Sequence, residues 1–281
     1  MKRLRIRHQT GFNYGGEVTA SYNEARMLPA SSERQFVLHS QVDISPMSSQ
    51  HAYVDYWGTR VSSFEILTPH SELSLTATSL VEVRDREHSS EQTTWEDLPR
   101  VAGSQVQYVE QIRQTKLTEP PEDVAELARN IAHDSANPCE AAERIAHSLG
   151  EAIEYMQGVT GVHSTAHEAW TERKGVCQDI AHVALGALRS VGIPARYVSG
   201  YLHPKPDAAV GETIAGESHA WIEWFCGEWS GWDPTNLIPI GDRHVLVGRG
   251  RDYNDVAPLR GVYAGPFRSE LNVRVEITRE L

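Results

Sequence analysis

Hydrophobic and polar residues alternate with a period of two from residue 4 to about residue 86. The clearest runs of this kind are 4–8, 37–44, 61–67 and 73–83, with polar turns between them. Short alternating runs predict antiparallel strands that pack as a sheet or a sandwich. The segment Asp55–Thr59 is expected to form a hairpin turn, in which Gly58 supplies the positive φ angle that such turns need. The first part of the chain is therefore predicted to be β-rich.

A helical period replaces this alternation in the middle of the chain. Residues 88–105 are rich in Ser, Thr, Glu and Gln and are expected to form a connector. Apolar positions then recur every three or four residues, which is typical of amphipathic helices. This spacing predicts four helices. The first follows Pro120–Pro121, the second and third run over 138–153 and 166–172, and the fourth begins at Cys177 and ends at Gly192.

The period returns to two after the last of these helices. Strands are predicted over 195–202, 219–224 and 228–232, and the Pro-, Asp- and Gly-rich stretch 203–216 is expected to be a loop. Helices followed by antiparallel strands are typical of α+β proteins. We therefore predict an α+β fold with two domains. The first is β-rich and sandwich-like and covers residues 1–105, and the second, with a C-terminal extension, covers residues 106–281.

Composition and charge argue against several classes of partner. The 281 residues include 26 Lys and Arg against 38 Asp and Glu, so the formal net charge is −12. That charge would repel nucleic acid, which is not expected as a partner. No run approaches the roughly 20 apolar residues of a membrane span, and the N-terminal residues alternate between basic and apolar without forming the apolar stretch of a signal peptide. A membrane partner is likewise not expected.

The three cysteines, Cys139, Cys177 and Cys226, are too few for a disulfide framework, and their odd number leaves at least one thiol free. All three are expected to be unpaired. Because unpaired thiols are typical of a reducing compartment, a cytoplasmic location is expected. Cys226 falls in a predicted hairpin loop and Cys139 on a predicted helix, so only Cys177 begins a predicted helix.

The position of Cys177 at a helix start indicates a reactive thiol. Its sulfur would face unpaired backbone N–H groups and the positive end of the helix dipole, which favour a thiolate. A thiolate is the form that attacks a carbonyl carbon, and the cysteine's own N–H can stabilise the oxyanion that results. The alternative is a small buried residue, because free cysteines are usually buried.

Two further residues are placed where they could act on this thiol. If Phe225–Gly227 is a three-residue hairpin loop, Trp224 pairs with Glu228 and His219 lies opposite Asp233. Directly opposed residues have Cβ atoms about 4.5–5.5 Å apart, close enough for a carboxylate to orient an imidazole. Taken singly, a strand histidine is more often an ordinary polar residue, and Asp before Pro is a common turn starter. Their joint appearance with a helix-start cysteine favours a nucleophile, a base and an orienting carboxylate.

Four segments that carry these residues occur together in the order of a known family. They are Gly175–His182, Gly192–Tyr201, Ser218–Glu223 and Trp232–Asn236. Together they resemble the bacterial transglutaminase-like superfamily. About the first 90 residues resemble the β-rich domain that accompanies this core in bacterial proteins. The segment Gly248–Tyr253 resembles the family's downstream segment, with Gly250–Arg251 lengthening the usual run.

The resemblance implies a papain-like fold and cysteine-dependent acyl transfer. It implies Cys177 as the nucleophile, His219 as the general base and acid, and Asp233 as the orienting carboxylate. The family's chemistry is attack on a carboxamide or peptide carbonyl, formation of a thioester, and release of the acyl group to water or to an amine. A protein or peptide substrate and no cofactor are therefore expected.

A second oxyanion donor is expected near the nucleophile. Tyr155 precedes Cys177 by 22 residues, near a helix end or on a short strand, where its hydroxyl could reach the site. Packing is the alternative role for this tyrosine. Gln178 and Asp179 are expected to be local structural partners. His182 lies about 140° around the helix from Cys177 and is not expected in the triad.

Two other functions are compatible with the sequence. A catalytically silent module could use the same cleft to hold a peptide, although it would not need all three residues of the triad. Metal binding is the weaker alternative, because the 13 histidines include no His-Glu-x-x-His run and no Cys-x-x-Cys pair occurs. His163 and His167, although four residues apart, precede a clear helix. No metal site is therefore predicted.

Overall fold

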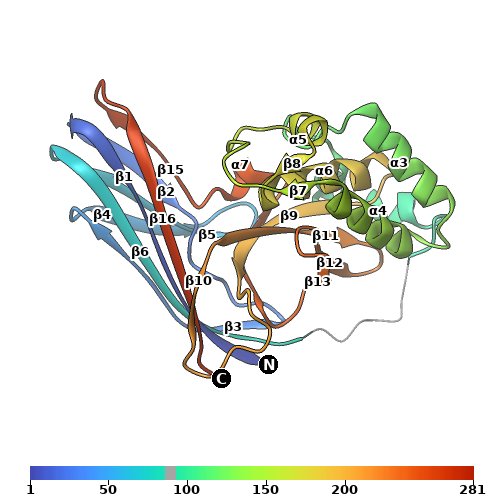
Figure 1. Ribbon diagram of the computed structural model, residues 1–281, viewed down its shortest axis with the longest axis horizontal. Coiled ribbons are helices and arrows are strands. Elements are labelled where there is room, and N and C mark those ends of the chain that lie inside the picture. Colours follow the sequence, from blue (N-terminus) through green and yellow to red (C-terminus); the bar gives the residue numbers. More distant parts are fainter. Residues whose placement is uncertain (86–92) are drawn as a thin grey trace.

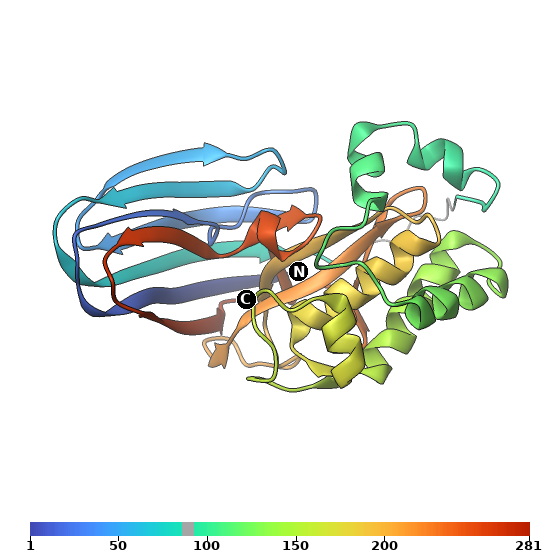
Figure 2. The ribbon, with the colours of Figure 1, turned by 90° about the horizontal axis from the view of Figure 1, so that it is seen from above.

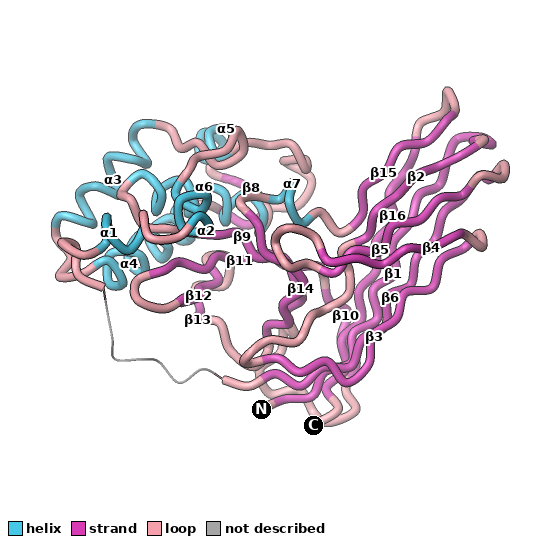
Figure 3. Tube along the Cα trace, turned by 180° about the vertical axis from the view of Figure 1, so that it is seen from behind, coloured by secondary structure: helices cyan, strands magenta, loops and turns pink. Residues whose placement is uncertain are grey.

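The structure is a computed structural model that describes residues 1–85 and 93–281. Long, twisted strands occupy one side of the molecule and most of the helices occupy the other (Figure 1). The two ends of the chain lie close together near the junction of these two parts, as the view from behind also shows (Figure 3).

The helices of the described residues are α1 (Leu98–Ala102), α2 (Val106–Ile112), α3 (Glu122–His133), α4 (Pro138–Ala152), α5 (Ala166–Glu172), α6 (Cys177–Ser190) and α7 (Tyr253–Val256). None of them has the length and apolar character that crossing a membrane requires. The strands are β1 (Lys2–Val18), β2 (Ala20–Ala25), β3 (Gln35–Ser45), β4 (Ser49–Val54), β5 (Arg60–Ile66), β6 (His70–Val83), β7 (Glu154–Tyr155), β8 (Lys174–Gly175), β9 (Ala195–Leu202), β10 (Thr213–Gly216), β11 (Ser218–Phe225), β12 (Trp229–Asp233), β13 (Ile238–Pro239), β14 (His244–Gly250), β15 (Leu259–Ala264) and β16 (Ser269–Arg279).

Two antiparallel sheets form the strand-rich part, in two layers (Figure 2). One has the order β10-β16-β1-β6-β3 and the other the order β15-β2-β5-β4. Every second side chain of a strand faces the opposite sheet, and the core formed in this way includes Tyr14, Phe64 and Leu75. Gly58 has a φ of 81° in the turn between β4 and β5. The predicted antiparallel strands and the glycine turn are therefore confirmed.

The last strands of the chain return to these two sheets. β16 pairs with β1 from Leu4↔Arg279 to Tyr14↔Ser269, and β15 pairs with β2. β10, which lies in a stretch expected to be a loop, extends the first sheet by pairing with β16. The sequence division assigns residues 259–279 to the second domain, whereas in space these residues complete the sandwich.

The helical part is built on a second five-stranded sheet, of order β13-β12-β11-β9-β14. α6 packs on β9 and β11 and contacts α3, α4 and α5. Its buried residues include Ile180, Leu185 and Leu188, and the helix is buried along most of its length. The predicted α+β fold is confirmed, and α6 is its central helix.

A smaller apolar cluster joins the two parts. Leu4 and Val81 of the sandwich share this buried cluster with Tyr201 of β9 and Val245 of β14. The Tyr201 hydroxyl also lies 2.9 Å from Nδ1 of His8 on β1. The sandwich therefore supports the sheet on which the candidate site is built.

The helices predicted from the spacing of apolar residues are present as α3, α4, α5 and α6. The two helices α1 and α2 were not predicted. α1 lies inside the stretch expected to be a connector and α2 follows it, and both are too short to show a clear period of apolar positions. Residues 88–92 of the expected connector lie outside the described residues.

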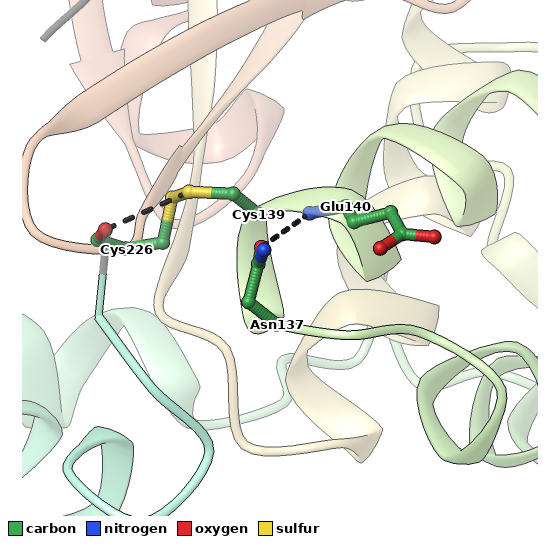
Figure 4. The surroundings of a disulfide bond; sticks show 4 residues. All are labelled: Asn137, Cys139, Glu140 and Cys226. Atoms are coloured by element: carbon green, nitrogen blue, oxygen red, sulfur yellow. Dashed lines mark hydrogen bonds between the residues drawn. A yellow bond between two sulfur atoms is a disulfide. The ribbon is translucent and has the colours of Figure 1, made fainter. Parts of the chain in front are cut away.

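A disulfide joins Cys139, in the first turn of α4, to Cys226, in the loop between β11 and β12 (Figure 4). The side chain of Asn137 fixes the start of α4 by accepting the N–H of Glu140 at 2.9 Å. The expectation that all three cysteines are unpaired is therefore wrong, because this pair is 87 residues apart in sequence and meets only in the fold. Cys177 remains as the free thiol. Because two of the three cysteines are paired, the cysteines no longer favour a reducing compartment.

Candidate active site

Cys177 is the first residue of the central helix, α6. The residue before it, Val176, is extended, and its N–H donates to the carboxylate of Asp179 at 2.8 Å. The same carboxylate accepts the hydroxyl of Thr160 at 2.6 Å, so Asp179 is the local structural partner that was expected. A Cβ atom at Gly175 would lie 2.7 Å from Cβ of Asp179, which leaves room only for glycine. These contacts fix the start of the helix, where the first backbone N–H groups lack intrahelical acceptors.

His219 and Asp233 lie on the neighbouring strands β11 and β12. Nε2 of His219 is 2.7 Å from Oδ2 of Asp233, and the aspartate side chain is fully buried. His219 also interacts with the thiol of Cys177, which is one cause of the shift in the pKa of the imidazole. Since Nε2 faces the carboxylate, Nδ1 is the ring nitrogen that remains for the sulfur. The structure therefore brings together the three residues that the sequence singled out.

The register of the β11–β12 hairpin differs from the predicted one. Phe225 pairs with Trp229, so the three-residue loop begins one residue later than predicted. This register sets Asp233 opposite Trp221, which makes it a diagonal neighbour of His219. The predicted direct pairing of His219 with Asp233 is therefore wrong. The two side chains still meet, because diagonal neighbours on one face of a sheet lie within reach of long side chains.

Several donors surround the carboxylate of Asp233. Its Oδ1 accepts the backbone N–H groups of Thr235 and Asn236 at 3.0 and 3.1 Å, and its Oδ2 accepts the side-chain amide of Asn236 at 2.8 Å. Burial alone would raise the pKa of Asp233, but hydrogen bonds from His219 and His244 outweigh burial and hold this pKa well below its usual range. Asp233 is therefore a carboxylate of fixed orientation at neutral pH.

His244, the first residue of β14, is a neighbour of Asp233 that the sequence did not indicate. The N–H of Gly241 donates to Nδ1 of His244 at 3.2 Å, so a neutral ring carries its proton on Nε2. Nε2 lies 3.4 Å from Oδ2 of Asp233 and donates toward it. Burial lowers the pKa of His244, which keeps the ring neutral. A histidine at the start of an ordinary strand gives no local signal of this contact.

The protonation of His219 follows from its two partners. Burial alone would lower its pKa, but the interactions with Asp233 and Cys177 outweigh burial and raise it to about 10. The imidazole is therefore protonated at neutral pH, with the N–H of Nε2 directed to the carboxylate. A protonated imidazole in this position can give a proton to a leaving group.

Tyr155 lies on the short strand β7, which was one of its two expected positions. Its hydroxyl donates to Glu217 at 3.1 Å and accepts the side-chain amide of Gln157 at 3.3 Å. Burial raises the pKa of Tyr155, and the nearby charges of Glu217 and Cys177 add to the effect. The hydroxyl of Tyr155 thus interacts electrostatically with Cys177, but its single proton is donated to Glu217. The oxyanion role of Tyr155 stays a prediction.

Two other residues near the helix start have structural contacts. The amide of Gln178 donates to the backbone carbonyl of Val162 at 3.2 Å, as expected for a local partner. His182 is fully buried and accepts the N–H of Tyr253 at 3.2 Å, away from the triad. In the part of the chain that the structure describes, no group of three or more His, Cys, Asp or Glu side chains is arranged to hold a metal ion.

A cleft of about 450 Å³ opens beside His219. Residues that line it include Tyr155, Leu202, Pro204 and Glu217. Its volume falls within the range of sites that hold small ligands or side chains. A substrate group bound in this cleft would therefore lie next to the imidazole that contacts Cys177.

The fold and this arrangement define a class of protein: an α+β protein with a papain-like core, in which a cysteine begins a central helix and a histidine and an aspartate lie on adjacent strands. Residues 4–82 match the model of the bacterial transglutaminase-like N-terminal region, and residues 125–235 match that of the transglutaminase-like superfamily. The second range includes Cys177, His219 and Asp233. The chain belongs to the transglutaminase-like superfamily.

Relatives and a solved structure extend this similarity over the whole chain. The "Uncharacterized protein ML0607" of Mycobacterium leprae is 45% identical over 281 residues, covering 99% of both chains. The "Uncharacterized protein Rv2569c" of Mycobacterium tuberculosis is 32% identical over 293 residues, covering 98% of this chain and 92% of the relative. A crystal structure from Cytophaga hutchinsonii, named "putative cysteine protease", superposes with a TM-score of 0.79 at 21% identity, covering 99% of this chain and 90% of the other. This last similarity shows that the two proteins share their fold.

Proposed function

We propose that this protein transfers acyl groups from a carboxamide or peptide carbonyl, with Cys177 as the nucleophile, His219 as the general base and acid, and Asp233 as the orienting carboxylate. The observation that carries the proposal is one imidazole that is hydrogen-bonded to a buried carboxylate and interacts with a free thiol at a helix start. Membership of the transglutaminase-like superfamily supports an enzyme of this type.

The reaction begins at the sulfur. The thiolate of Cys177 attacks the carbonyl carbon, a C–S bond forms, and the carbonyl oxygen becomes an oxyanion. In this proposal the backbone N–H of Cys177, at the helix start, donates a hydrogen bond to this oxygen and stabilises it. His219 gives its Nδ1 proton to the leaving nitrogen as the C–N bond breaks, which leaves a thioester and a free amine.

The second half of the reaction restores the thiolate. Neutral His219 takes a proton from water or from an acceptor amine as that molecule attacks the thioester carbon. The C–S bond then breaks and the product is a carboxylic acid or a new amide. Asp233 stays hydrogen-bonded to Nε2 of His219 throughout the reaction, so Nδ1 faces the sulfur during both formation and breakdown of the thioester.

The proposed substrate is a protein or a peptide, because the donor in this chemistry is a peptide or carboxamide carbonyl. The proposed steps need no cofactor, since every proton transfer takes place at His219.

A paired assay tests the proposal. Purified wild type and Cys177→Ala are incubated with a panel of peptides that contain glutamine, and two products are measured: new amine ends from hydrolysis, and incorporation of a fluorescent primary amine. We expect wild type to give at least one product and Cys177→Ala to lose roughly 10⁴-fold or more in rate, because the nucleophile is absent. Ser190→Ala, at the far end of α6, is the matched control and should keep the wild-type rate.

Two outcomes would contradict the proposal. Activity that survives in Cys177→Ala would exclude the nucleophile proposed here. A wild type that forms neither product, and whose Cys177 reacts with iodoacetamide no faster than the thiol of a short unstructured peptide, would instead indicate a peptide-binding module without catalysis.

A further inference from the structure

Glu217 gives the cleft beside His219 its charge. Among the described residues that line this cleft, Glu217 is the acidic one and none is Lys or Arg. The remaining lining is neutral apart from the catalytic histidine itself. The cleft therefore has a negative charge next to the imidazole.

The carboxylate of Glu217 is oriented by neutral donors. The Tyr155 hydroxyl donates to Oε2 at 3.1 Å, and the amide of Gln157 donates to Oε1 at 2.7 Å. No arginine or lysine in the described residues forms an ion pair with it. A carboxylate oxygen accepts more than one hydrogen bond, so each oxygen keeps the capacity to accept a further donor. The carboxylate of Glu217 is thus held in place without a lysine or arginine partner among the described residues.

Glu217 lies beside the catalytic histidine. It precedes His219 by two residues, between the end of β10 and the start of β11, and both residues line the same cleft. A group paired with Glu217 would therefore lie next to the imidazole.

Part of the cleft wall is apolar. Leu202, Pro204 and Ala215 line it together with Glu217. Apolar walls that lead to a single carboxylate suit a ligand with a methylene stem and a positively charged end, because the stem is removed from water while the charge is paired.

We propose that Glu217 and these walls form a subsite for an alkylammonium group, so that preferred acyl substrates carry a positively charged side chain next to the reacting carbonyl. The proposal rests on the acyl-transfer function proposed for Cys177. The group bound there is a recognition element and not the attacking amine, because an ammonium paired with a carboxylate has no free electron pair with which to attack.

Three methanethiosulfonate reagents test the subsite without a known substrate. The 2-aminoethyl reagent is a cation, the methyl reagent is neutral and the 2-sulfonatoethyl reagent is an anion. Each converts the free thiol to a mixed disulfide and releases methanesulfinate, and Cys177 is the one cysteine of the chain that is not in a disulfide. The rate of modification of Cys177 is measured with each reagent and divided by the rate with 2-mercaptoethanol, which removes the intrinsic reactivity of the reagents.

We expect the normalised rate with the cation to exceed that with the anion roughly tenfold in wild type, since a single charge in the cleft changes the two rates in opposite directions. Glu217→Gln keeps the shape of the side chain and removes its charge, and should reduce this preference to roughly twofold. Glu212→Gln removes the same charge from a half-buried residue already paired with Lys205 at 2.7 Å, and should keep the wild-type preference.

The preference is a ratio measured at one thiol, so it does not depend on whether Cys177 catalyses acyl transfer. An equal preference in wild type and Glu217→Gln would overturn the subsite and leave the proposed function intact. If wild type had no acyl-transfer activity and Glu217→Gln still reduced the preference for the cation, the proposed function would be overturned. The proposed subsite for a positively charged group would then still stand.

Discussion

Replacing Asp233 with asparagine is expected to lower turnover of the amide substrate found in the paired assay roughly 10³-fold. The side-chain amide that Asp233→Asn introduces would present an N–H to Nε2 of His219 in place of an acceptor. The neutral ring would then carry its proton on Nδ1, facing Cys177, and could not take a proton from the thiol. The loss should appear in kcat, because the substrate cleft is unchanged.

The same substitution should move the alkaline limit of activity. The acylation step needs a proton on His219, whose pKa is raised to about 10 with the help of Asp233. Wild-type activity should therefore persist well above neutral pH and fall as pH rises through about 10. Without the carboxylate the pKa of His219 drops, so in Asp233→Asn the residual activity should be lost at lower pH than in wild type.

Asp207→Asn is the matched control for this experiment, since it makes the same chemical change at an exposed residue of the loop after β9. Circular dichroism would show that both variants fold. If Asp233→Asn turned over substrate at the wild-type rate with an unchanged alkaline limit, Asp233 would have no part in orienting His219.

Breaking the Cys139–Cys226 disulfide is expected to reduce the free energy of unfolding by about 4 kcal/mol. The bond closes a loop with a sequence separation of 87 residues, and the loop entropy that it removes from the unfolded chain grows with that length. It ties the tip of the β11–β12 hairpin to α4, while His219 and Asp233 lie toward the opposite ends of the same strands. Denaturant unfolding of Cys226→Ser should therefore show a large loss of stability, with activity at 25 °C within about threefold of wild type.

Cys177→Ser is the matched control for that substitution, because it changes a cysteine to serine without affecting the disulfide. Its free energy of unfolding should stay within about 1 kcal/mol of wild type. Addition of dithiothreitol to wild type should reproduce the loss seen in Cys226→Ser. If neither the reductant nor the substitution changed the unfolding midpoint, the disulfide would not contribute to stability.

Local patterns in the sequence were sufficient for the elements that carry the site. The start of α6 is set by contacts within a few residues, in which Gly175 leaves room for Asp179 and Asp179 accepts the N–H of Val176. The strands β9, β11 and β12 follow from their apolar alternation. The residues at the centre of the site could therefore be named before the structure was known.

Features that depend on distant contacts could not be read from such patterns. The pairing of Cys139 with Cys226 and the contact of His244 with Asp233 join segments that approach only in the folded protein. β15 and β16 likewise pair with strands that are distant in sequence, so their place in the sandwich could not be predicted from local patterns. The hairpin register was missed for a different reason, since a glycine-containing loop of three residues can begin at either of two positions, and the sequence favours neither.

The central claim is that Cys177 forms a covalent acyl intermediate, and mass spectrometry after brief reaction with p-nitrophenyl acetate tests it most directly. The sample is quenched in acid, digested, and the peptide that contains Cys177 is examined. We expect an acetyl group on Cys177 in wild type that hydroxylamine removes, as for a thioester, with slower formation in Asp233→Asn and none on this peptide in Cys177→Ala. An acetyl group found only on other residues, or a Cys177 that acquires it no faster than a small free thiol does, would contradict the account.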